Sequence, residues 1–209
     1  MTSSGRRVCY WQAVDEISKK EAVKILRLTP DEIRKQIWKE LGRATQDRFH
    51  AWRTPVLATA CKNGLVHART VVLRNVDPVQ GHIQIFTDAR SPKVAEISDT
   101  SNAVFVFWSS KLRWQIRVRV DISALTTGPT VAACWERVKY SASAGDYSSL
   151  LAPGSLLNSD SSESVEINPI EPHFAVLNAR ITEIDWLELA RTGHRRARFT
   201  SDSWEWLTP

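Results

Sequence analysis

Basic and hydroxyl side chains stand at the ends of two apolar runs between residues 68 and 93, a stretch that reads ARTVVLRNVDPVQGHIQIFTDARSPK. Arg69 and Arg74 flank the first run, TVVL, and are expected where one strand begins and ends. The second run, IQIFT, ends in one hydroxyl residue and is followed by a second hydroxyl and two further cations. These residues are Thr87, Arg90, Ser91 and Lys93. Guanidinium groups and the free N–H groups of a helix N-terminus both bind phosphate oxygens. The stretch therefore predicts an anion site, although solvated loop charges, with Ser91 acting only as a helix cap, would give the same pattern.

A second polar row lies in RWQIRVRV, residues 113 to 120. Alternate residues of a strand share a face, so one face would carry Arg113, Gln115, Arg117 and Arg119. An amphipathic strand with a solvated outer face is the commonest source of this alternation. The row could instead face a ligand or a partner subunit. The Gln115 amide both donates and accepts hydrogen bonds, which suits the edge of a heteroaromatic ring.

A third basic group, GHRRARF, lies near the C-terminus and contains His194, Arg195, Arg196 and Arg198. It is either an ordinary surface segment or a contact to a substrate phosphate. The nucleophile, nucleotide-loop and metalloprotease motifs are absent from the sequence, so no catalytic side chain is expected.

The balance of charge favours an anionic partner. The net charge is +5 and the pI about 9.3, which would suit a phosphorylated small molecule, a nucleic acid or a membrane surface. The N-terminus has no apolar core typical of a signal peptide, and no window reaches the length of a membrane span. Cys9, Cys61 and Cys134 form no CxxC pair and show no metal-like spacing to histidine. We expect a soluble cytoplasmic protein without a bound metal.

The spacing of apolar residues predicts a mainly β protein with flanking helices. LTPDEIRKQIWKEL carries a helix start, with Thr29 as the cap and Glu32 completing a capping box, and Gly42 is expected to end or bend this helix. Asn63-Gly64 marks a hairpin turn between two strands. Five or six short strands at even spacing indicate an antiparallel barrel or sandwich.

The expected organisation is an N-terminal helical arm, residues 1–50, followed by residues 51–209, with a single domain overall. A short helix should start with Ser91 as its cap and Pro92 at its first position. Residues 158–166, NSDSSESVE, are of low complexity and should form a loop.

Three stretches, RTVVLR, FTDARSPK and FWSSKLRWQIRVRV, occur in the order seen in pyridoxamine 5′-phosphate oxidase-like flavoproteins, which the chain resembles best between residues 54 and 125. The resemblance implies the FMN-binding split β-barrel, a Greek-key-like antiparallel barrel. It also implies a homodimer in which both chains contact each FMN at the interface. The nine Trp residues of the sequence are compatible with a large aromatic interface.

The flavin contacts of that family, carried over by position, imply a set of cofactor-binding residues. These are Arg69, Thr70, Val71, Val72, Arg74, Phe86, Thr87, Arg90, Ser91, Lys93, Gln115 and Arg198. Arg90 is included because Pro92 stands where the family has a cation in its phosphate clamp. The implied substrate contacts are Arg74, His194 and Arg196, of which the last two stand roughly where the family has Arg and His.

The resemblance implies an FMN-dependent oxidoreductase of the pyridoxamine/pyridoxine 5′-phosphate oxidase type. Hydride would pass from a small substrate, with B6 vitamer phosphates as candidates, to FMN and then to dioxygen or another acceptor. The altered C-terminal stretch keeps open a flavin-binding protein without B6 oxidase activity. A nucleic-acid-binding barrel is the third alternative, disfavoured because the aromatic residues beside the arginine row fall on the opposite face. We expect no nucleic-acid or membrane partner.

Overall fold

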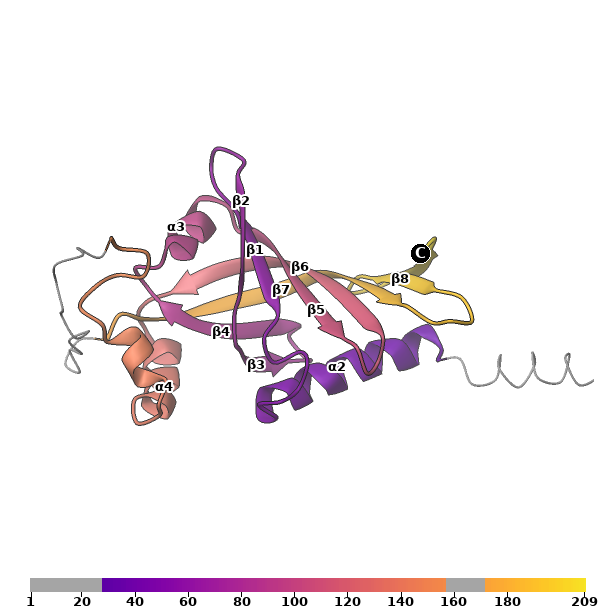
Figure 1. The fold of residues 1–209 in the computed structure, drawn as a ribbon, viewed down its shortest axis with the longest axis horizontal. Helices are drawn as coiled ribbons and strands as arrows, with labels where there is room; N and C mark the ends of the chain where they lie inside the picture. The colour runs from indigo at the N-terminus through magenta and orange to yellow at the C-terminus, as the bar shows by residue number, and fades with distance from the viewer. Residues whose placement is uncertain (1–27, 157–171) are drawn as a thin grey trace, which may run out of the picture. The chain divides into compact units, whose positions relative to one another are not determined.

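The computed structural model describes residues 28–156 and 172–209 (Figure 1). The predicted loop at 158–166 and Cys9 lie outside these ranges. The residues group into two compact units, Met1–Ile37 and Trp38–Pro209, and the second contains every described strand. The division into an arm of residues 1–50 and a domain of residues 51–209 stays a prediction.

Helix α2 spans Pro30–Gln46 and starts as its sequence predicts. The backbone N–H of Thr29 donates to Glu32 Oε2 at 2.7 Å, and the backbone N–H of Glu32 donates to Thr29 Oγ1 at 3.4 Å. This reciprocal pair is the capping box. The helix does not end at Gly42 but continues to Gln46.

Nine strands in the described ranges form one antiparallel sheet. Their bounds are β1 Val56–Ala60, β2 Val66–Thr70, β3 Leu73–Asp77, β4 His82–Asp88, β5 Asn102–Ser109, β6 Trp114–Leu125, β7 Phe174–Glu188, β8 Arg195–Phe199 and β9 Trp204–Leu207. The strand order is β2-β1-β5-β6-β7-β4-β3, with β8 paired to β7 and β9 paired to β8. The prediction of a mainly β protein with flanking helices is confirmed.

The β1–β2 hairpin turns at Asn63-Gly64, as the sequence predicts. Gly64 has a φ of 85°, a conformation that glycine adopts without steric cost. The register places Arg69 opposite Leu57, which is fully buried. Because paired residues of adjacent strands share a face, Arg69 lies on the interior face of the sheet, and so does His67 two residues earlier.

The stretch RTVVLR is not one strand, so the expectation that Arg69 and Arg74 stand at the two ends of a single strand is wrong. Strand β2 ends at Thr70 and β3 starts at Leu73. These two strands lie at opposite ends of the strand order, yet only two residues join them. The sheet must therefore curl until its ends nearly meet, which gives the barrel.

The break between β2 and β3 has a cause elsewhere in the chain. The backbone N–H of Val71 donates to the Pro55 carbonyl, and that of Leu73 donates to the Arg53 carbonyl, both at 2.9 Å. The segment before β1 thus takes the hydrogen bonds that would otherwise continue a strand pairing. No local property of TVVL reveals this competition, since its residues all favour strands.

Two further helices cover parts of the sheet. Helix α3 spans Pro92–Asp99, with Ser91 and Pro92 in the predicted cap and first positions, although the Ser91 side chain makes no capping hydrogen bond. Helix α4 spans Pro129–Val138, and a 3₁₀ turn follows at Ala144–Tyr147. No helix in the described ranges combines the length and apolar character needed to cross a membrane.

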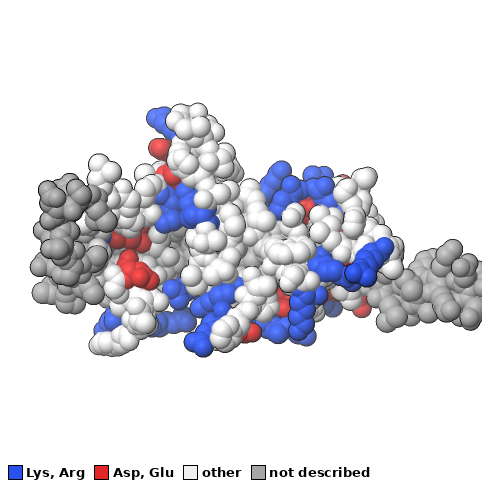
Figure 2. Space-filling view, in the orientation of Figure 1, with Lys and Arg blue, Asp and Glu red and all other residues white. Residues whose placement is uncertain are grey.

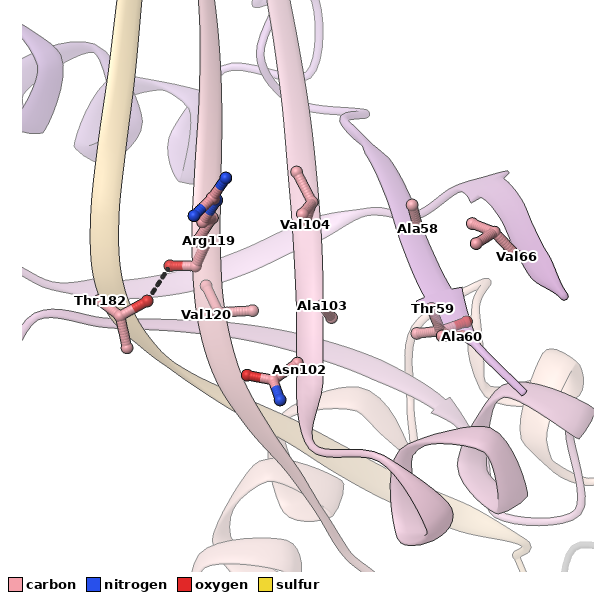
Figure 3. A pocket seen from close by; sticks show the side chains of 10 residues that line it. All are labelled: Ala58, Thr59, Ala60, Val66, Asn102, Ala103, Val104, Arg119, Val120 and Thr182. Carbon is pink, nitrogen blue, oxygen red and sulfur yellow. Dashed lines mark hydrogen bonds between the residues drawn. The ribbon is translucent and has the colours of Figure 1, made fainter. Parts of the chain in front are cut away.

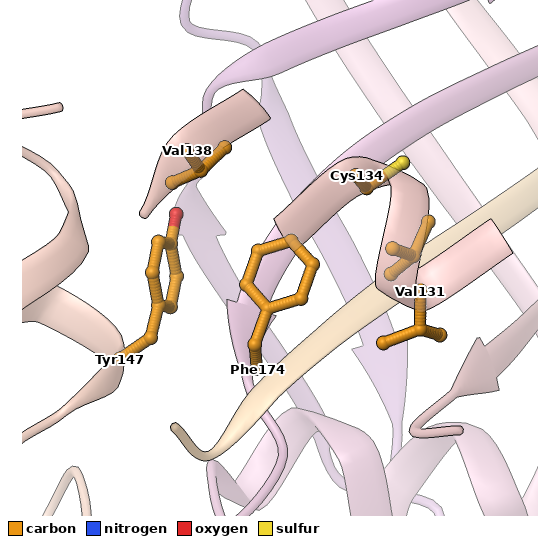
Figure 4. Close-up of a cluster of buried hydrophobic side chains, with 6 residues drawn as sticks. Val131, Cys134, Val138, Tyr147 and Phe174 are labelled. Atoms are coloured by element: carbon orange, nitrogen blue, oxygen red, sulfur yellow. The ribbon is translucent and has the colours of Figure 1, made fainter. Parts of the chain in front are cut away.

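Helix α4 packs over a cluster of buried side chains (Figure 4). The members of this α4 cluster are Val131, Cys134, Val138, Tyr147, Phe174 and Val176. Phe174 meets Tyr147 edge-to-face, with ring centroids 5.1 Å apart. Such aromatic packing fixes the end of β4 that leads to α3, because Phe86 of β4 also packs against the cluster.

Candidate functional site

Lys93 joins two buried hydroxyls where β4 meets α3. Thr87 at the end of β4 and Ser91 before α3 are 7% and 6% exposed. Lys93 Nζ donates to Thr87 Oγ1 at 2.9 Å and also to Ser91 Oγ. We call these three residues the Lys93 clamp. A cation and two hydroxyls at a helix N-terminus are groups that bind phosphate.

Arg69 brings a second positive charge to the Lys93 clamp. The pKa of Lys93 lies below its usual value, first because burial disfavours the charged amine and next because Arg69 repels its proton, while Asp88 and Glu96 act in the opposite direction. The two cations are near enough for their charges to interact, and an anion beside Lys93 would offset both the burial of its charge and this repulsion. The structure thus brings together four residues predicted from the sequence, whose binding to FMN stays a prediction.

Glu96 of α3 holds Arg69 in place. Arg69 Nη2 donates to Glu96 Oε2 at 2.9 Å, and Arg69 Nη1 donates to Thr59 Oγ1. Burial raises the pKa of Glu96, but hydrogen bonds from His67, Thr59 and Arg69 outweigh it and lower the pKa to about 2. No motif in the sequence singles out Glu96. Its burial depends on the β1–β2 hairpin packing against α3, which no local pattern signals.

Arg90 lies at the same corner but faces a different partner. Its Nε donates to Asp88 Oδ1 at 3.1 Å and its Nη2 to Asp88 Oδ2 at 2.7 Å. Its Nη1 donates to the Leu150 carbonyl at 3.0 Å and Nη2 to the Ser149 carbonyl at 2.8 Å. Arg90 therefore ties the segment after the 3₁₀ turn to β4. The structure does not bring its guanidinium to the Lys93 clamp as the substitute for the cation missing at Pro92.

Arg74 lies over the α4 cluster rather than at the clamp. Its guanidinium carbon is 5.7 Å from the centroid of the Phe86 ring. Burial lowers the pKa of Arg53, and the nearby charge of Arg74 lowers it further. Burial raises the pKa of Tyr147, although Arg74 acts in the opposite direction. Arg74 Nε is buried and has no hydrogen-bond partner within residues 28–156 and 172–209. A buried donor without a hydrogen-bond partner is a candidate contact for a ligand.

The three residues between Arg69 and the start of β3 could contact a ligand mainly through their backbone. Thr70 is exposed at the end of β2, while Val71 and Val72 are half-buried in the connection to β3. The N–H of Val71 is already bonded to the Pro55 carbonyl. The connection runs from the β2 end, which carries Arg69, to the β3 end, which carries Arg74.

The remaining predicted residues form what we call the distal group: Gln115, His194, Arg196 and Arg198. Gln115 on β6 is paired with Trp108 of β5 and is half-buried. His194 is exposed in the turn before β8. The two arginines stand on β8 and are both bound to acids.

Those acids use the hydrogen-bond donors of the distal arginines. Arg196 Nε and Nη2 donate to the two carboxylate oxygens of Asp185 at 2.9 and 2.7 Å, and Arg117 donates to the same carboxylate. Arg198 Nε donates to Glu205 Oε1 at 2.6 Å. The arginines are thus positioned by neighbours on β7 and β9.

The distal group does not meet the Lys93 clamp within one chain. Thr87 of the clamp is paired with Ala175, near the start of β7. Arg198 is paired with Asp185, ten residues further along the same strand, which is about 33 Å at the usual rise of a strand. The predicted cofactor residues therefore fall into two groups at different ends of β7.

Comparison with known proteins agrees with this architecture. Residues 35–126 match the family model described as pyridoxamine 5′-phosphate oxidase, FMN-binding domain. Pyridoxine/pyridoxamine 5′-phosphate oxidase of Bartonella henselae is 34% identical over 88 residues. That alignment covers 42% of this chain and 42% of the relative, so the chain matches about two fifths of the curated protein.

Two solved structures share the fold over most of the chain. A pyridoxamine 5′-phosphate oxidase-related, FMN binding protein from Nostoc punctiforme superposes with a TM-score of 0.69 at 24% identity, covering 88% of this chain and 100% of that one. PhzG from Burkholderia lata, solved with tetrahydrophenazine-1-carboxylic acid, gives 0.67 at 19% identity, with coverages of 88% and 98%. At these identities the likeness shows the fold.

The curled antiparallel sheet is the split β-barrel of FMN-binding proteins, as the resemblance implied. Its first four strands and α3, which carry the Lys93 clamp and Arg69, fall inside the matched segment. Residues 35–126 are thus similar to the FMN-binding domain of pyridoxamine 5′-phosphate oxidases, a match that covers less than half of the chain.

Proposed function

We propose that the protein binds FMN and works as an FMN-dependent oxidoreductase. The observation that carries the proposal is Lys93 Nζ between the buried hydroxyls of Thr87 and Ser91, with Arg69 as the neighbouring cation. These groups fit a phosphate dianion, which would relieve the repulsion between Lys93 and Arg69 and accept hydrogen bonds from both hydroxyls. The match to an FMN-binding domain supports FMN as the molecule that carries this phosphate.

The chain's own residues would bind and orient the cofactor. Lys93 and Arg69 would neutralise the phosphate. Arg74, whose buried Nε has no partner among the described residues, would donate to a group of the ligand lying over the β2–β3 connection. Bound FMN would supply the redox chemistry, taking hydride from a small substrate and passing electrons to dioxygen or another acceptor.

A flavin-binding protein without B6 oxidase activity is the second candidate. One observation favours it: Arg196, an implied substrate contact, has both ends of its guanidinium fork on Asp185. His194, the other implied contact in this stretch, is exposed in a turn. B6 vitamer phosphates are therefore the first substrates to assay, and failure to oxidise them would favour this second candidate while leaving FMN binding intact.

We also propose that two copies form a homodimer, in which the distal group of one copy completes the cofactor site of the other. The separation of the two groups along β7 within one chain supports this arrangement. A groove of about 480 Å³ crosses β1, β2, β5 and β6 (Figure 3). It is lined by small side chains, among them Ala58, Ala60 and Val104, with Arg119 at its side. Small residues allow close approach of a second sheet.

A nucleic-acid-binding role receives less support from the charges. Figure 2 shows Lys and Arg in several separate groups on the face displayed, one of them below the β1–β2 hairpin. In the arginine row of β6, Arg117 is bound to Asp185, and Arg119 lies 3.6 Å from Glu183. A row neutralised in this way offers little to a phosphate backbone.

The first experiment is the visible absorption spectrum of the purified protein, with any released chromophore identified by mass. We expect the bands of an oxidised flavin and release of FMN. A colourless protein that takes up no added FMN would overturn the proposal. If FMN is bound, oxidation of pyridoxamine phosphate and pyridoxine phosphate then separates the enzyme from the flavin-binding protein.

A further inference from the structure

Three metal-ligating side chains converge near the turn of the β1–β2 hairpin, outside the Lys93 clamp. Cys61 follows β1 directly, His67 lies on β2, and Glu96 lies on α3. We call them the Cys–His–Glu cluster. Their donor atoms all lie within 4.8 Å of one another. The hairpin brings the end of β1 beside the start of β2, and α3 brings the carboxylate to the first two side chains.

The spacing of the donor atoms is close to that of ligands on one zinc ion. Cys61 Sγ is 3.5 Å from His67 Nδ1, and His67 Nδ1 is 2.7 Å from Glu96 Oε1. Zinc bonds of roughly 2.0 Å to N and O and 2.3 Å to S, at tetrahedral angles, place ligand atoms about 3.3 to 3.6 Å apart. The sulfur–nitrogen pair has this spacing already. The nitrogen–oxygen pair, now a hydrogen bond, must open by about half an ångström.

The carboxylate of Glu96 is oriented by a separate set of contacts. Its Oε2 accepts hydrogen bonds from Arg69 Nη2, at 2.9 Å, and from Thr59 Oγ1. Oε1 is left to face His67. Hydrogen bonds that fix the second oxygen of a ligating carboxylate are a regular feature of metal sites, because they hold the ligand and its charge in place.

The cluster is open on one side. The His67 side chain is 54% exposed, Cys61 is half-buried, and Glu96 is buried. Three protein ligands and an accessible fourth position, which water would fill, are the arrangement of an open zinc site. A thiolate, an imidazole and a carboxylate together favour zinc over magnesium or calcium, which prefer oxygen ligands only.

We propose that Cys61, His67 and Glu96 bind a zinc ion, with water as the fourth ligand. The Cys61 thiol gives up its proton to solvent on binding and no electrons are transferred. The sequence expectation of no metal missed this site because five residues separate Cys61 from His67 and Glu96 lies 29 residues further on. The proposal does not rest on FMN binding.

Cobalt titration of the full chain tests the site. The chain is freed of metal with a chelator and carries Cys9→Ser and Cys134→Ala, so that Cys61 is its one thiol among the three cysteines of the sequence. We expect a thiolate-to-cobalt charge-transfer band that saturates at one ion per chain and is displaced by zinc. His67→Gln, at an exposed position that folding tolerates, should weaken binding by at least about tenfold.

Two controls make the outcome decisive. His82→Gln, on β4 and away from the cluster, should leave the cobalt band unchanged, and Cys61→Ser should abolish it. Far-ultraviolet circular dichroism checks that each variant folds. The proposal is overturned if no charge-transfer band forms in large excess of cobalt, or if His67→Gln binds the ion as tightly as its parent.

Discussion

The surroundings of Lys93 disfavour its charged form in the folded chain. Burial and Arg69 both disfavour its charge, as its lowered pKa shows. Lys93→Met should therefore weaken FMN binding by about 10- to 100-fold, since a charge-assisted hydrogen bond contributes roughly 1.5 to 3 kcal/mol. The same substitution should leave the FMN-free protein as stable as its parent or more so. Fluorescence titration with FMN and urea unfolding measure the two effects.

Lys139→Met, at the residue that follows α4, is the matched control for Lys93→Met. Lys139 pairs with Glu136 on the surface of the same helix, away from the clamp. FMN affinity should not change in this variant. Equal loss of affinity in both lysine variants would show that the clamp has no special role.

Asp185 should make stability depend on pH in the acid range. Burial raises its pKa, but hydrogen bonds from Arg196 and Arg117 outweigh burial, so the pKa lies below the usual 3.8. The ionised Asp185 thus stabilises the folded state fully above pH 3.8. This stabilisation is lost as the pH falls through the pKa that Asp185 has in the folded state. Asp185→Asn should lower the free energy of unfolding by roughly 1 to 3 kcal/mol at neutral pH.

The difference between Asp185→Asn and its parent should shrink as the pH drops below 3.8, which urea unfolding at several pH values measures. Asp121→Asn is the control, because Asp121 forms an exposed pair with Arg180. It should change stability little at any pH. A gap between parent and Asp185→Asn that stays constant into strong acid would contradict this account.

The turn between β5 and β6 contains the strained backbone position of the described residues. Arg113 has a φ of 56°, the only positive φ outside glycine there. This conformation costs about 1 to 2 kcal/mol for any residue other than glycine. Arg113→Gly should raise the free energy of unfolding by up to about 1 kcal/mol, once the greater freedom of glycine in the unfolded chain is subtracted. Thermal unfolding measures the gain.

Lys111→Gly in the same turn should lower stability instead. Lys111 has an ordinary φ, so the substitution adds only the entropy of glycine. If both glycine variants shift the melting temperature in the same direction, strain at Arg113 is not the cause.

The elements of the fold could be predicted where short-range patterns decide them. Thr29 and Glu32 mark the start of α2, and Asn63-Gly64 marks the first hairpin, because the contacts involved span a few residues. The break within RTVVLR could not be predicted, since Arg53 and Pro55 impose it from another part of the chain.

The contacts of the candidate site also divide into short-range ones, which the sequence predicts, and long-range ones, which it does not. Thr87, Ser91 and Lys93 are close in sequence, so their approach follows from one strand and one helix start. The pairing of Arg90 with the carbonyls of Ser149 and Leu150 spans about sixty residues and depends on tertiary packing. The sequence therefore does not reveal these contacts of Arg90, whose role in binding FMN stays a prediction.

The molecule as a whole should associate through the groove across β1, β2, β5 and β6. Val104 lies in this groove and is half-buried. Val104→Glu should convert a dimer into a monomer, because a carboxylate would be desolvated against the second copy. Sedimentation equilibrium should give twice the mass of one chain for the parent and the mass of a single chain for the variant.

Val79→Glu controls for the added charge. Val79 is 93% exposed in the turn between β3 and β4, so its substitution should leave the dimer intact. A monomeric parent, or a Val104→Glu variant that stays dimeric, would place the partner surface elsewhere.

Strand β7 has a consequence for synthesis on the ribosome. It pairs with β6 on one side and β4 on the other, and it comes last of the three in the chain. Until residues 174–188 emerge, β4 and β6 each present an unpaired edge, which is open to pairing with other chains. The nascent protein therefore passes through a long interval in which it is prone to aggregate, and we expect it to depend on chaperones until β7 has been made.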